Sequence, residues 1–423
     1  MKKILLLLAA FSISAGNAIC QISLQLTPEQ KLQQLKEQVS DNLTNNILSY
    51  WSAKMPDDVN GGFYGRIDRN NQVIPDAAKG GILNARILWT YSAAYRVTKN
   101  PVYLSIATRA KDYILSNFID REYGGAYMML NAKGEHQDTR KHTYTQAFFI
   151  YGLSEYARAT GDKEALKAAK SIFKLFEKKV LDKESNGYFE VFSRDWQRSR
   201  DRLIGEKTPV DEKTMNTSLH VMEAYANLYR VWSSKRMAER LENMVNIFLD
   251  HIIDKNSFHL ICFFDRNWNG TSQIDSYGHD IECSWLLLEA ASLLKKPELI
   301  NKVKQVSIKI ADAASEGILS DGSMLTEKDR ATGHIRATRS WWEQAESVVG
   351  YTNAFELTGN ENYLNKAINA WNFIDKYMID KVNGAWFTSV SADGVPGGDK
   401  AGNWICPYHN GRMCMEIIER VEE

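Results

Sequence analysis

Two histidines stand at helical spacing from residues that could orient them. In SYGHDIECSW (276–285), His279 lies three positions before Glu282, and in KTMNTSLHVMEAY (213–225), Asn216 lies four positions before His220. Side chains at these spacings project from the same face of a helix. A carboxylate beside an imidazole can hold the ring and tune its pKa, ordinarily about 6.5, for proton transfer near neutral pH. Since a histidine within a helix is more often structural, each pair alone is weak support for catalysis.

Aromatic and acidic residues accompany a third histidine later in the chain. RSWWEQAE (339–346) places Trp342 and Glu346 on one helical face, and NWICPYHNGR (403–412) places Trp404 five residues before His409. Aromatic faces stack on the apolar sides of sugar rings, and carboxylates accept hydrogen bonds from hydroxyl groups. This combination predicts a platform that binds a saccharide.

Two further polar groups interrupt apolar helical segments. Arg86 lies in GGILNARILW (80–89) and Tyr144 in KHTYTQAF (141–148). A buried polar group without a partner is costly. We therefore expect these two side chains to meet either each other or a ligand.

Other kinds of chemistry lack their motifs. H-x-x-E is not the H-E-x-x-H arrangement of zinc enzymes, and the chain has no G-x-G-x-x-G, G-x-x-x-x-G-K-[ST] or G-x-S-x-G. We expect neither a metal nor a cofactor. The 52 basic and 52 acidic residues cancel, which gives no electrostatic reason to expect nucleic acid or an anionic membrane as partner. A small neutral substrate is the natural expectation.

The first twenty residues, MKKILLLLAAFSISAGNAIC, have the layout of a secretory signal peptide. Their apolar run is shorter than the ~20 residues that span a bilayer. We expect residues 1–20 to be removed and the protein to be exported, to the periplasm. Cys20 is an alternative lipid anchor, although Asn17-Ala18-Ile19 departs from the usual lipobox. Cys262, Cys283, Cys406 and Cys414 form no C-x-x-C pair, which leaves disulfides and buried thiols both open.

A repeat determines how these residues must be positioned. Five segments share one layout, an apolar helical stripe, a short polar turn and a second amphipathic helix; they are 95–110, 156–171, 229–244, 291–306 and 355–370. Successive turns lie roughly 60 to 70 residues apart, a period typical of stacked supersecondary units.

A second series lies between the helical turns and pairs glycine with alternating aromatic residues: 61–68, 123–130, 186–193, 268–275 and 383–390. This pattern predicts tight turns with short strands or loops. The long loops then share one face, where functional groups gather. About six hairpins that close into a ring would form one concave pocket. We predict an all-α (α/α)6 barrel as a single domain over residues 21–423.

Six segments in this order resemble the N-acylglucosamine 2-epimerase superfamily, and within it the cellobiose 2-epimerases: GGILNARILWTYSAAY, KHTYTQAF, NTSLHVMEAY, GHDIECSWLL, SWWEQAE and PYHNGR. The resemblance covers nearly all of the chain after residue 20. It implies an (α/α)6 barrel that interconverts, without a cofactor, the C2 epimers of the reducing-end hexose of a β-1,4-linked disaccharide. We expect a monomer.

The resemblance also implies roles for individual residues. His279 and His409 correspond to the two acid/base residues that remove and return the C2 proton, and His220 to a third histidine that assists ring opening or holds the intermediate. The remaining positions correspond to groups around the sugar: Arg86, Tyr144 and Asn216 near C1 and C2, Glu282 beside a histidine, and Trp342, Glu346 and Trp404 for stacking and hydroxyl binding. We expect Glu282 to hold His279.

Alternative functions remain open at this point. The same barrel could be an N-acetylglucosamine 2-epimerase or an aldose–ketose isomerase. A glycoside hydrolase or lyase would need two carboxylates, for which Glu282 and Glu346 are available. A sugar-binding protein without turnover belongs to a different class. The sequence does not distinguish cellobiose from β-1,4-mannobiose as substrate.

Overall fold

The structure, a computed structural model, describes residues 26–199 and 212–421. The predicted signal peptide (1–20), with Cys20, lies outside these residues. No helix among them is long and apolar enough to cross a membrane.

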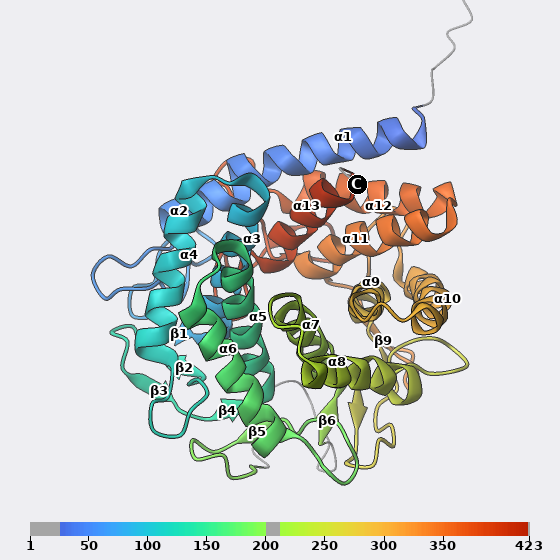
Figure 1. Ribbon diagram of the computed structural model, residues 1–423. Helices are drawn as coiled ribbons and strands as arrows, with labels where there is room; N and C mark the ends of the chain where they lie inside the picture. Colours follow the sequence, from blue (N-terminus) through green and yellow to red (C-terminus); the bar gives the residue numbers. More distant parts are fainter. Residues whose placement is uncertain (1–25, 200–211, 422–423) are drawn as a thin grey trace, which may run out of the picture.

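Within the described ranges, six helices form a closed inner ring in which each packs against the next and the last packs against the first (Figure 1). They are α3 (Gly81–Thr98), α5 (Thr143–Thr160), α7 (Met215–Val231), α9 (Tyr277–Leu293), α11 (Trp341–Thr358) and α13 (Tyr408–Arg420). Most residues of these helices are buried, so their apolar residues surround the helix rather than forming one stripe.

An outer layer covers the inner ring. It consists of α4 (Pro101–Tyr113), α6 (Lys163–Leu175), α8 (Lys235–Ile247), α10 (Pro297–Ala314) and α12 (Glu361–Phe373), each packed on the inner helix that precedes it in sequence. Only one side of each outer helix is buried, which explains the amphipathic pattern of the sequence. The predicted (α/α)6 barrel is confirmed.

The short turns between inner and outer helices follow from their residue types. Gly161 and Gly359 end α5 and α11 in the left-handed conformation, at φ 78° and 68°. The next residues, Asp162 and Asn360, accept backbone N–H groups of the outer helices. A glycine C-cap followed at once by an Asp or Asn N-cap stops one helix and starts the next.

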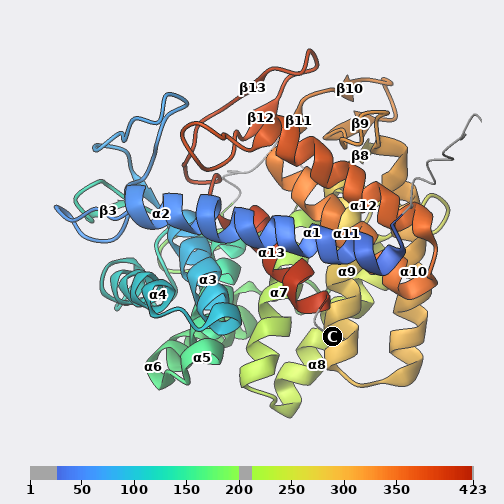
Figure 2. The same ribbon diagram turned by 90° about the horizontal axis from the view of Figure 1, so that it is seen from above.

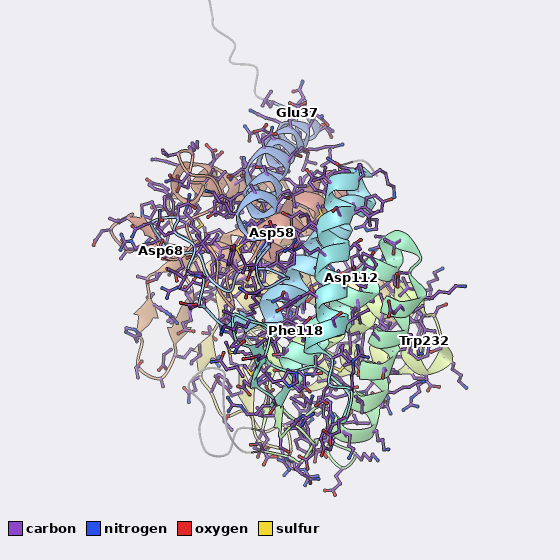
Figure 3. The ribbon with its side chains drawn as sticks, turned by 90° about the vertical axis from the view of Figure 1, so that its left-hand side faces the viewer. Glu37, Asp58, Asp68, Asp112, Phe118 and Trp232 are labelled. Atoms are coloured by element: carbon purple, nitrogen blue, oxygen red, sulfur yellow. The ribbon has the colours of Figure 1, made fainter. Side chains whose placement is uncertain are left out.

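The two ends of the chain form the sixth helical pair. The N-terminal helix α1 (Pro28–Asp41) lies across α13, the last helix, and continues through the π-helix η1 (Asn42–Leu48) into α2 (Ser49–Lys54) (Figure 2). The loop after α2 then reaches α4, where Asp58 forms an ion pair with Arg109 at 2.9 Å (Figure 3). This pair has no short turn, so the repeat in the sequence shows five turns rather than six.

The long loops lie at the opposite end of the barrel from the short turns. Four outer helices end in a π-helical turn, η2 (Ile114–Phe118), η3 (Phe176–Val180), η4 (Phe248–Ile252) and η6 (Ile374–Met378), and α10 ends in the 3₁₀ turn η5 (Ser315–Gly317). The described loops form small antiparallel sheets in the orders β1-β2-β3, β4-β5, β6-β7, β10-β9-β8 and β11-β12-β13.

The strands of these sheets have two or three residues each. They are β1 (Lys79–Gly80), β2 (Met129–Leu130), β3 (His136–Asp138), β4 (Lys141–His142), β5 (Val191–Phe192), β6 (Lys213–Thr214), β7 (Phe263–Phe264), β8 (Ile274–Asp275), β9 (Glu327–Asp329), β10 (Ile335–Arg336), β11 (Arg339–Ser340), β12 (Ser389–Val390) and β13 (Pro396–Gly397).

One predicted loop turn was misplaced. The fourth copy of the glycine–aromatic turn is bridged by Ile253 and Leu260, as Ile119 and Ala126 bridge the second, and does not lie at 268–275. At this turn Phe258 has a φ of 63°. A bulky residue in the left-handed region is rare, so the expected glycine signal was absent.

Buried lysine–aspartate pairs recur in the long loops. The Nζ–Oδ2 distances are 2.7 Å for Lys79–Asp57, 2.9 Å for Lys141–Asp120, 3.1 Å for Lys213–Asp182 and 2.6 Å for Lys400–Asp380. Each aspartate also accepts two backbone N–H groups of its own turn. Each pair therefore fastens a loop turn to the segment that enters the barrel.

We predict that Lys400→Met lowers the free energy of unfolding by about 3 to 5 kcal/mol, because it leaves the buried Asp380 without its cation. Lys381→Met is the matched control, since the Lys381–Asp375 pair is exposed and is expected to contribute at most about 1 kcal/mol. Urea unfolding followed by circular dichroism measures both. Equal losses in the two variants would contradict the assignment of a structural role to the buried pair.

Candidate active site

The predicted site residues gather where the inner helices begin. Nine of them lie in the first two turns of α3, α5, α7, α9, α11 and α13, and Trp404 lies in the loop that enters α13. The N-terminus of a helix carries partial positive charge. The helices therefore present their positive ends to the long-loop face, which favours bound negative charge and disfavours protonated histidine.

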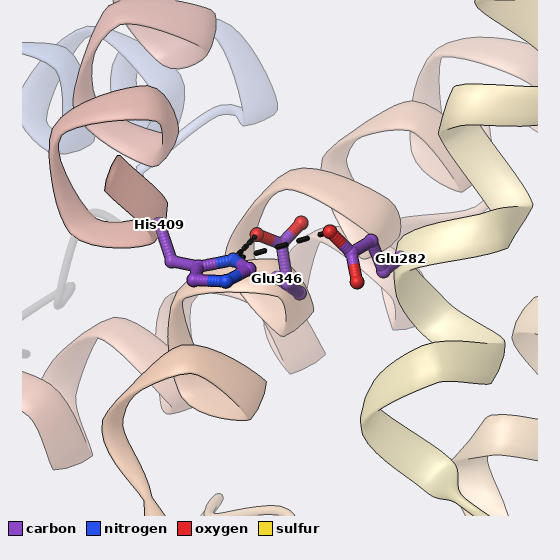
Figure 4. A group of neighbouring side chains, drawn as sticks. All are labelled: Glu282, Glu346 and His409. Carbon is purple, nitrogen blue, oxygen red and sulfur yellow. Dashed lines mark hydrogen bonds and ion pairs between the residues drawn. The ribbon is translucent and has the colours of Figure 1, made fainter. Parts of the chain in front are cut away.

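His409 is held by a carboxylate. Its Nδ1 lies 2.7 Å from Oε1 of Glu346 and 3.9 Å from Oε1 of Glu282 (Figure 4). The second oxygen of Glu346 accepts a hydrogen bond from Nε1 of Trp285 at 3.1 Å. Glu346 therefore holds the histidine, a contact that the resemblance, which implied hydroxyl binding at this position, did not predict.

Arg412 lies behind these residues and connects three helices. Its Nη2 donates to Oε1 of Glu282 at 2.6 Å and to Oε1 of Glu346 at 2.7 Å, and its Nη1 bonds to Glu223 and to the hydroxyl of Tyr408. The side chain is 1% exposed. One buried guanidinium thus bonds to carboxylates of α7, α9 and α11.

His220 is joined to the same network. Its Nδ1 lies 2.9 Å from Oε2 of Glu223, three positions on in α7. The other oxygen of Glu223 bonds to Arg412 and Tyr408. His220 and His409 therefore each have a carboxylate behind the ring, and the two carboxylates share one cation.

His279 differs from the other two histidines. Its Nδ1 lies 2.7 Å from Oγ of Ser276, the N-cap residue of α9. The prediction that Glu282 holds His279 is therefore wrong: Glu282 points to Arg412 and His409. A three-residue spacing puts two residues on one side of a helix, but at the start of α9 the nearer partner is the serine before the helix.

Aromatic rings connect the histidines. The ring of Trp342 lies 4.8 Å from that of His279 and 5.6 Å from that of His409. Gly278 permits this approach, because a Cβ atom there would lie 2.6 Å from the Trp342 ring. The centroid of the Tyr144 ring lies 4.8 Å from that of His220 and 5.4 Å from that of Trp404. Trp404 is 37% exposed and is available for stacking.

Arg86 and Tyr144 meet each other, one of the two outcomes expected from the sequence. Nη2 of Arg86 donates to the Tyr144 hydroxyl at 2.7 Å, and the guanidinium lies 4.2 Å from the Phe148 ring. The Nε atom of Arg86 is buried without a hydrogen-bond partner, as is Oδ1 of Asn216 in the first turn of α7. Such polar atoms are costly unless a ligand or water binds them.

Burial sets the ionisation of the site. It lowers the pKa of His279 to about 3, with a further contribution from His220, and together with Arg86 and Arg412 it holds the pKa of His409 well below the usual range. A lowered pKa favours the neutral imidazole, the form that accepts a proton. Burial and Glu346 raise the pKa of Glu282 to about 7.

The described residues contain one group that could in principle hold a metal ion, Glu282, Glu346 and His409, whose ligand atoms lie within 4.8 Å of one another. Arg412 already binds one oxygen of each carboxylate, and Glu346 holds Nδ1 of His409. A cation would have to displace a guanidinium from between two carboxylates. The donor set is therefore poorly suited to a metal.

Sequence reasoning missed Ser276, Glu223 and Arg412 as members of the site. Glu223 and Arg412 each lie three positions after a histidine, the spacing used for His279 and Glu282. The signal was therefore present, but their partners come from other helices and could not be read from the chain. The four cysteines left open by the sequence are buried and free.

Comparisons with known proteins identify the family of this chain. The sequence profile of the N-acylglucosamine 2-epimerase (GlcNAc 2-epimerase) family matches residues 62–410. The chain is 49% identical over 386 residues to a cellobiose 2-epimerase of Bacteroides fragilis, covering 91% of this chain and 98% of that protein. It is 41% identical over 386 residues to a cellobiose 2-epimerase of Ruminococcus albus, covering 90% and 98%.

Solved structures share the fold. The structure of cellobiose 2-epimerase from Bacillus thermoamylovorans has a TM-score of 0.89 at 42% identity, covering 92% of this chain and 100% of that one. A crystal structure of D-mannose isomerase has a TM-score of 0.80 at 19% identity, covering 93% and 100%. The second likeness concerns the fold alone.

We predict that Arg412→Met destabilises the protein by about 3 to 5 kcal/mol at pH 8, because three buried carboxylates lose their cation. Without Arg412 the already raised folded-state pKa values of Glu282 and Glu346 rise further above the unfolded value, and the lowered pKa of Glu223 loses the cation that holds it down. The folded protein then binds more protons than the unfolded chain, so stability falls as pH rises and the loss is smaller at pH 5. Urea midpoints at both pH values measure this difference.

Arg158→Met is the control, because Arg158 is partly exposed and lies 3.5 Å from Glu155. It is expected to change stability by less than about 1 kcal/mol at either pH. A loss in Arg412→Met that is the same at pH 5 and pH 8 would refute the charge argument.

Proposed function

The chain belongs to the N-acylglucosamine 2-epimerase family and is a carbohydrate epimerase, an isomerase; we propose that it is a cellobiose 2-epimerase. The proposed reaction inverts C2 of the reducing-end hexose of a β-1,4-linked disaccharide. The observation that carries the proposal is that His279 and His409 both lie beside the Trp342 ring, at centroid distances of 4.8 and 5.6 Å. A hexose bound beside this tryptophan would have two imidazoles within reach.

The proposed mechanism uses these two rings as proton carriers. After ring opening, one neutral imidazole removes the C2 proton, and the electrons of the C–H bond form an enediolate with negative charge on O1. Delivery of a proton from the other imidazole to the opposite face restores the aldehyde with C2 inverted. General acid–base catalysis of this kind contributes typically 10²- to 10⁴-fold.

The enediolate needs a positive partner, and Arg86 supports this role. Its guanidinium is buried, is fixed by Tyr144 at 2.7 Å, and keeps one N–H without a partner. Preorganised donors aimed at developing charge usually lower the barrier of such a reaction more than any other single effect. His220, backed by Glu223, is the proposed third histidine for ring opening, and Trp404 is the proposed stacking surface for the second sugar.

A hydrolase on the same barrel is disfavoured by the contacts of its candidate carboxylates. Glu282 and Glu346 both accept from the same Nη2 atom of Arg412, and Glu346 also holds His409. Hydrolysis needs an acid and a base or nucleophile on opposite sides of the bond. Two carboxylates bound to one guanidinium lack that arrangement.

The proposal predicts that the purified protein, without added metal or nucleotide, converts cellobiose in deuterated buffer to a disaccharide with an epimerised reducing end and deuterium at C2. Proton NMR of cellobiose and of β-1,4-mannobiose measures the product and identifies the faster substrate. Free monosaccharide would indicate a hydrolase, a ketose would indicate an aldose–ketose isomerase, and two unchanged sugars would count against the proposal.

We further predict that His279→Ala lowers kcat by at least about 10²-fold while the circular dichroism spectrum stays unchanged, because the fold does not depend on this ring. The control His334→Ala removes an exposed histidine of the loop between β9 and β10 and is expected to keep full activity. Wild-type turnover by His279→Ala would end the proposed assignment.

We also propose export directed by residues 1–20, on the strength of their two lysines, apolar run and small residues. Expression with the native N-terminus should yield a periplasmic protein that begins near residue 19 or 21. N-terminal sequencing tests this, and an intact Met1 in the cytoplasm would oppose it.

A further inference from the structure

The three histidines of the site differ in what lies behind the ring. Nδ1 of His220 and of His409 each faces a carboxylate, at 2.9 and 2.7 Å, whereas Nδ1 of His279 faces the hydroxyl of Ser276, at 2.7 Å. Among the described residues none bonds to Nε2 of His279, so this atom is left for the substrate. The difference separates His279 from His409, the two rings to which the proposed reaction assigns proton transfer.

The groups around His279 supply no other counter-charge. On α9 itself, Asp280 bonds to His259 and Glu282 bonds to Arg412. His220 of α7 and His409 of α13 are the neighbouring titratable rings, and His220 disfavours a positive charge on His279. Glu343 of α11 packs on Gly278, but its Oε2 accepts the backbone N–H of Ser340 at 2.8 Å. If His279 were protonated, its Nδ1–H would therefore face the hydroxyl of Ser276 and no carboxylate.

We propose that Ser276 is a positioning residue that keeps His279 a neutral base, so that His279 accepts the C2 proton while His409, backed by Glu346, carries and delivers the other proton. This inference rests on the proposed epimerase function. Ser276 is 6% exposed and occupies the N-cap position of α9, where its side chain makes no cap hydrogen bond to the helix backbone. Its hydroxyl can bond to Nδ1 in either role and so orients the ring without stabilising the imidazolium.

The proton balance follows from this division. In the working form His409 is protonated at both ring nitrogens, with Nδ1–H facing Glu346, whereas Nε2 of His279 carries no proton. His279 takes the proton from C2, and the C–H electrons become the C1–C2 double bond of the enediolate. His409 then gives its proton to C2 from the opposite face, and the C1 carbonyl re-forms. His279 finally releases its proton to solvent and His409 takes one up.

Three substitutions at Ser276 test separately whether this residue orients the His279 ring and whether it controls the charge of that ring. Ser276→Thr keeps the hydroxyl and is expected to stay within about threefold of wild-type kcat. Ser276→Ala removes one hydrogen bond and is expected to lower kcat about tenfold with KM unchanged. Ser276→Asp gives His279 a carboxylate like those of the other histidines. It is expected to raise the pKa of His279 by at least about one pH unit.

The decisive readout is the pH profile of kcat/KM, measured from each of the two epimers. In the reaction direction in which His279 is the base, Ser276→Asp should move the acid limb of the profile to higher pH. In the reverse reaction direction the acid limb should stay in place. Ser284→Ala is the matched control, since Ser284 is a buried serine of the same helix whose hydroxyl bonds to the carbonyl of Ile281. It should leave both profiles unchanged.

An NMR titration of the His279 ring in wild type and in the variants provides a readout that needs no turnover. If no sugar is epimerised but the titration moves in Ser276→Asp, the proposed function fails and the role of Ser276 in setting the ring's ionisation stands. If epimerisation occurs but neither the titration nor one acid limb moves, or if both limbs move equally, the inference is overturned. Should Ser276→Asp fail to fold, equal kcat values of the Thr and Ala variants would overturn it.

Discussion

A single buried guanidinium determines the arrangement of the site. Arg412 bonds to Glu223, Glu282 and Glu346, and so joins α13 to α7, α9 and α11. Three carboxylates could not lie together at the centre of the barrel without this cation, because the cost of burying like charges would separate them. Two of these carboxylates also hold His220 and His409. The positions of the inner helices, the orientation of two histidines and the local charge therefore depend on one side chain.

The repeat explains the scaffold, and α9, a helix that departs from it, carries the proposed proton carrier His279. Lysine–aspartate pairs fasten most of the loop turns, but Asp275 stands before α9 where lysine stands before α3, α5 and α7. At this hairpin Asp280 instead accepts the backbone N–H of Leu260 at 2.8 Å and bonds to His259 at 2.7 Å. A residue of α9 itself, Asp280, thus fastens the loop turn to the start of the helix. This is the helix that supplies His279, whose serine partner is also exceptional.

Patterns within one segment were predictable, whereas contacts between segments were not. The helical turns, the ring and the gathering of the ten candidate residues followed from periodicity, composition and resemblance. The sixth helical pair was not visible as a turn, because α1 and α13 come from opposite ends of the chain. The fourth loop turn was misplaced because Phe258 takes the usual place of glycine. The partner of His279 was wrong, because spacing along a helix does not show which of two neighbours the ring will face.

The sixth pair also bears on how the protein reaches its active state. Contacts of α1 and η1 with α13 join residues separated by most of the chain, for example Asn42 of η1 and Cys414. Closing so long a loop has a high entropic cost, and long-range contacts form late in folding. His409 and Arg412 arrive with the helix that closes the ring. A partly folded or truncated chain would lack both a closed barrel and a complete set of the proposed catalytic groups, so the proposed turnover would begin only when folding ends.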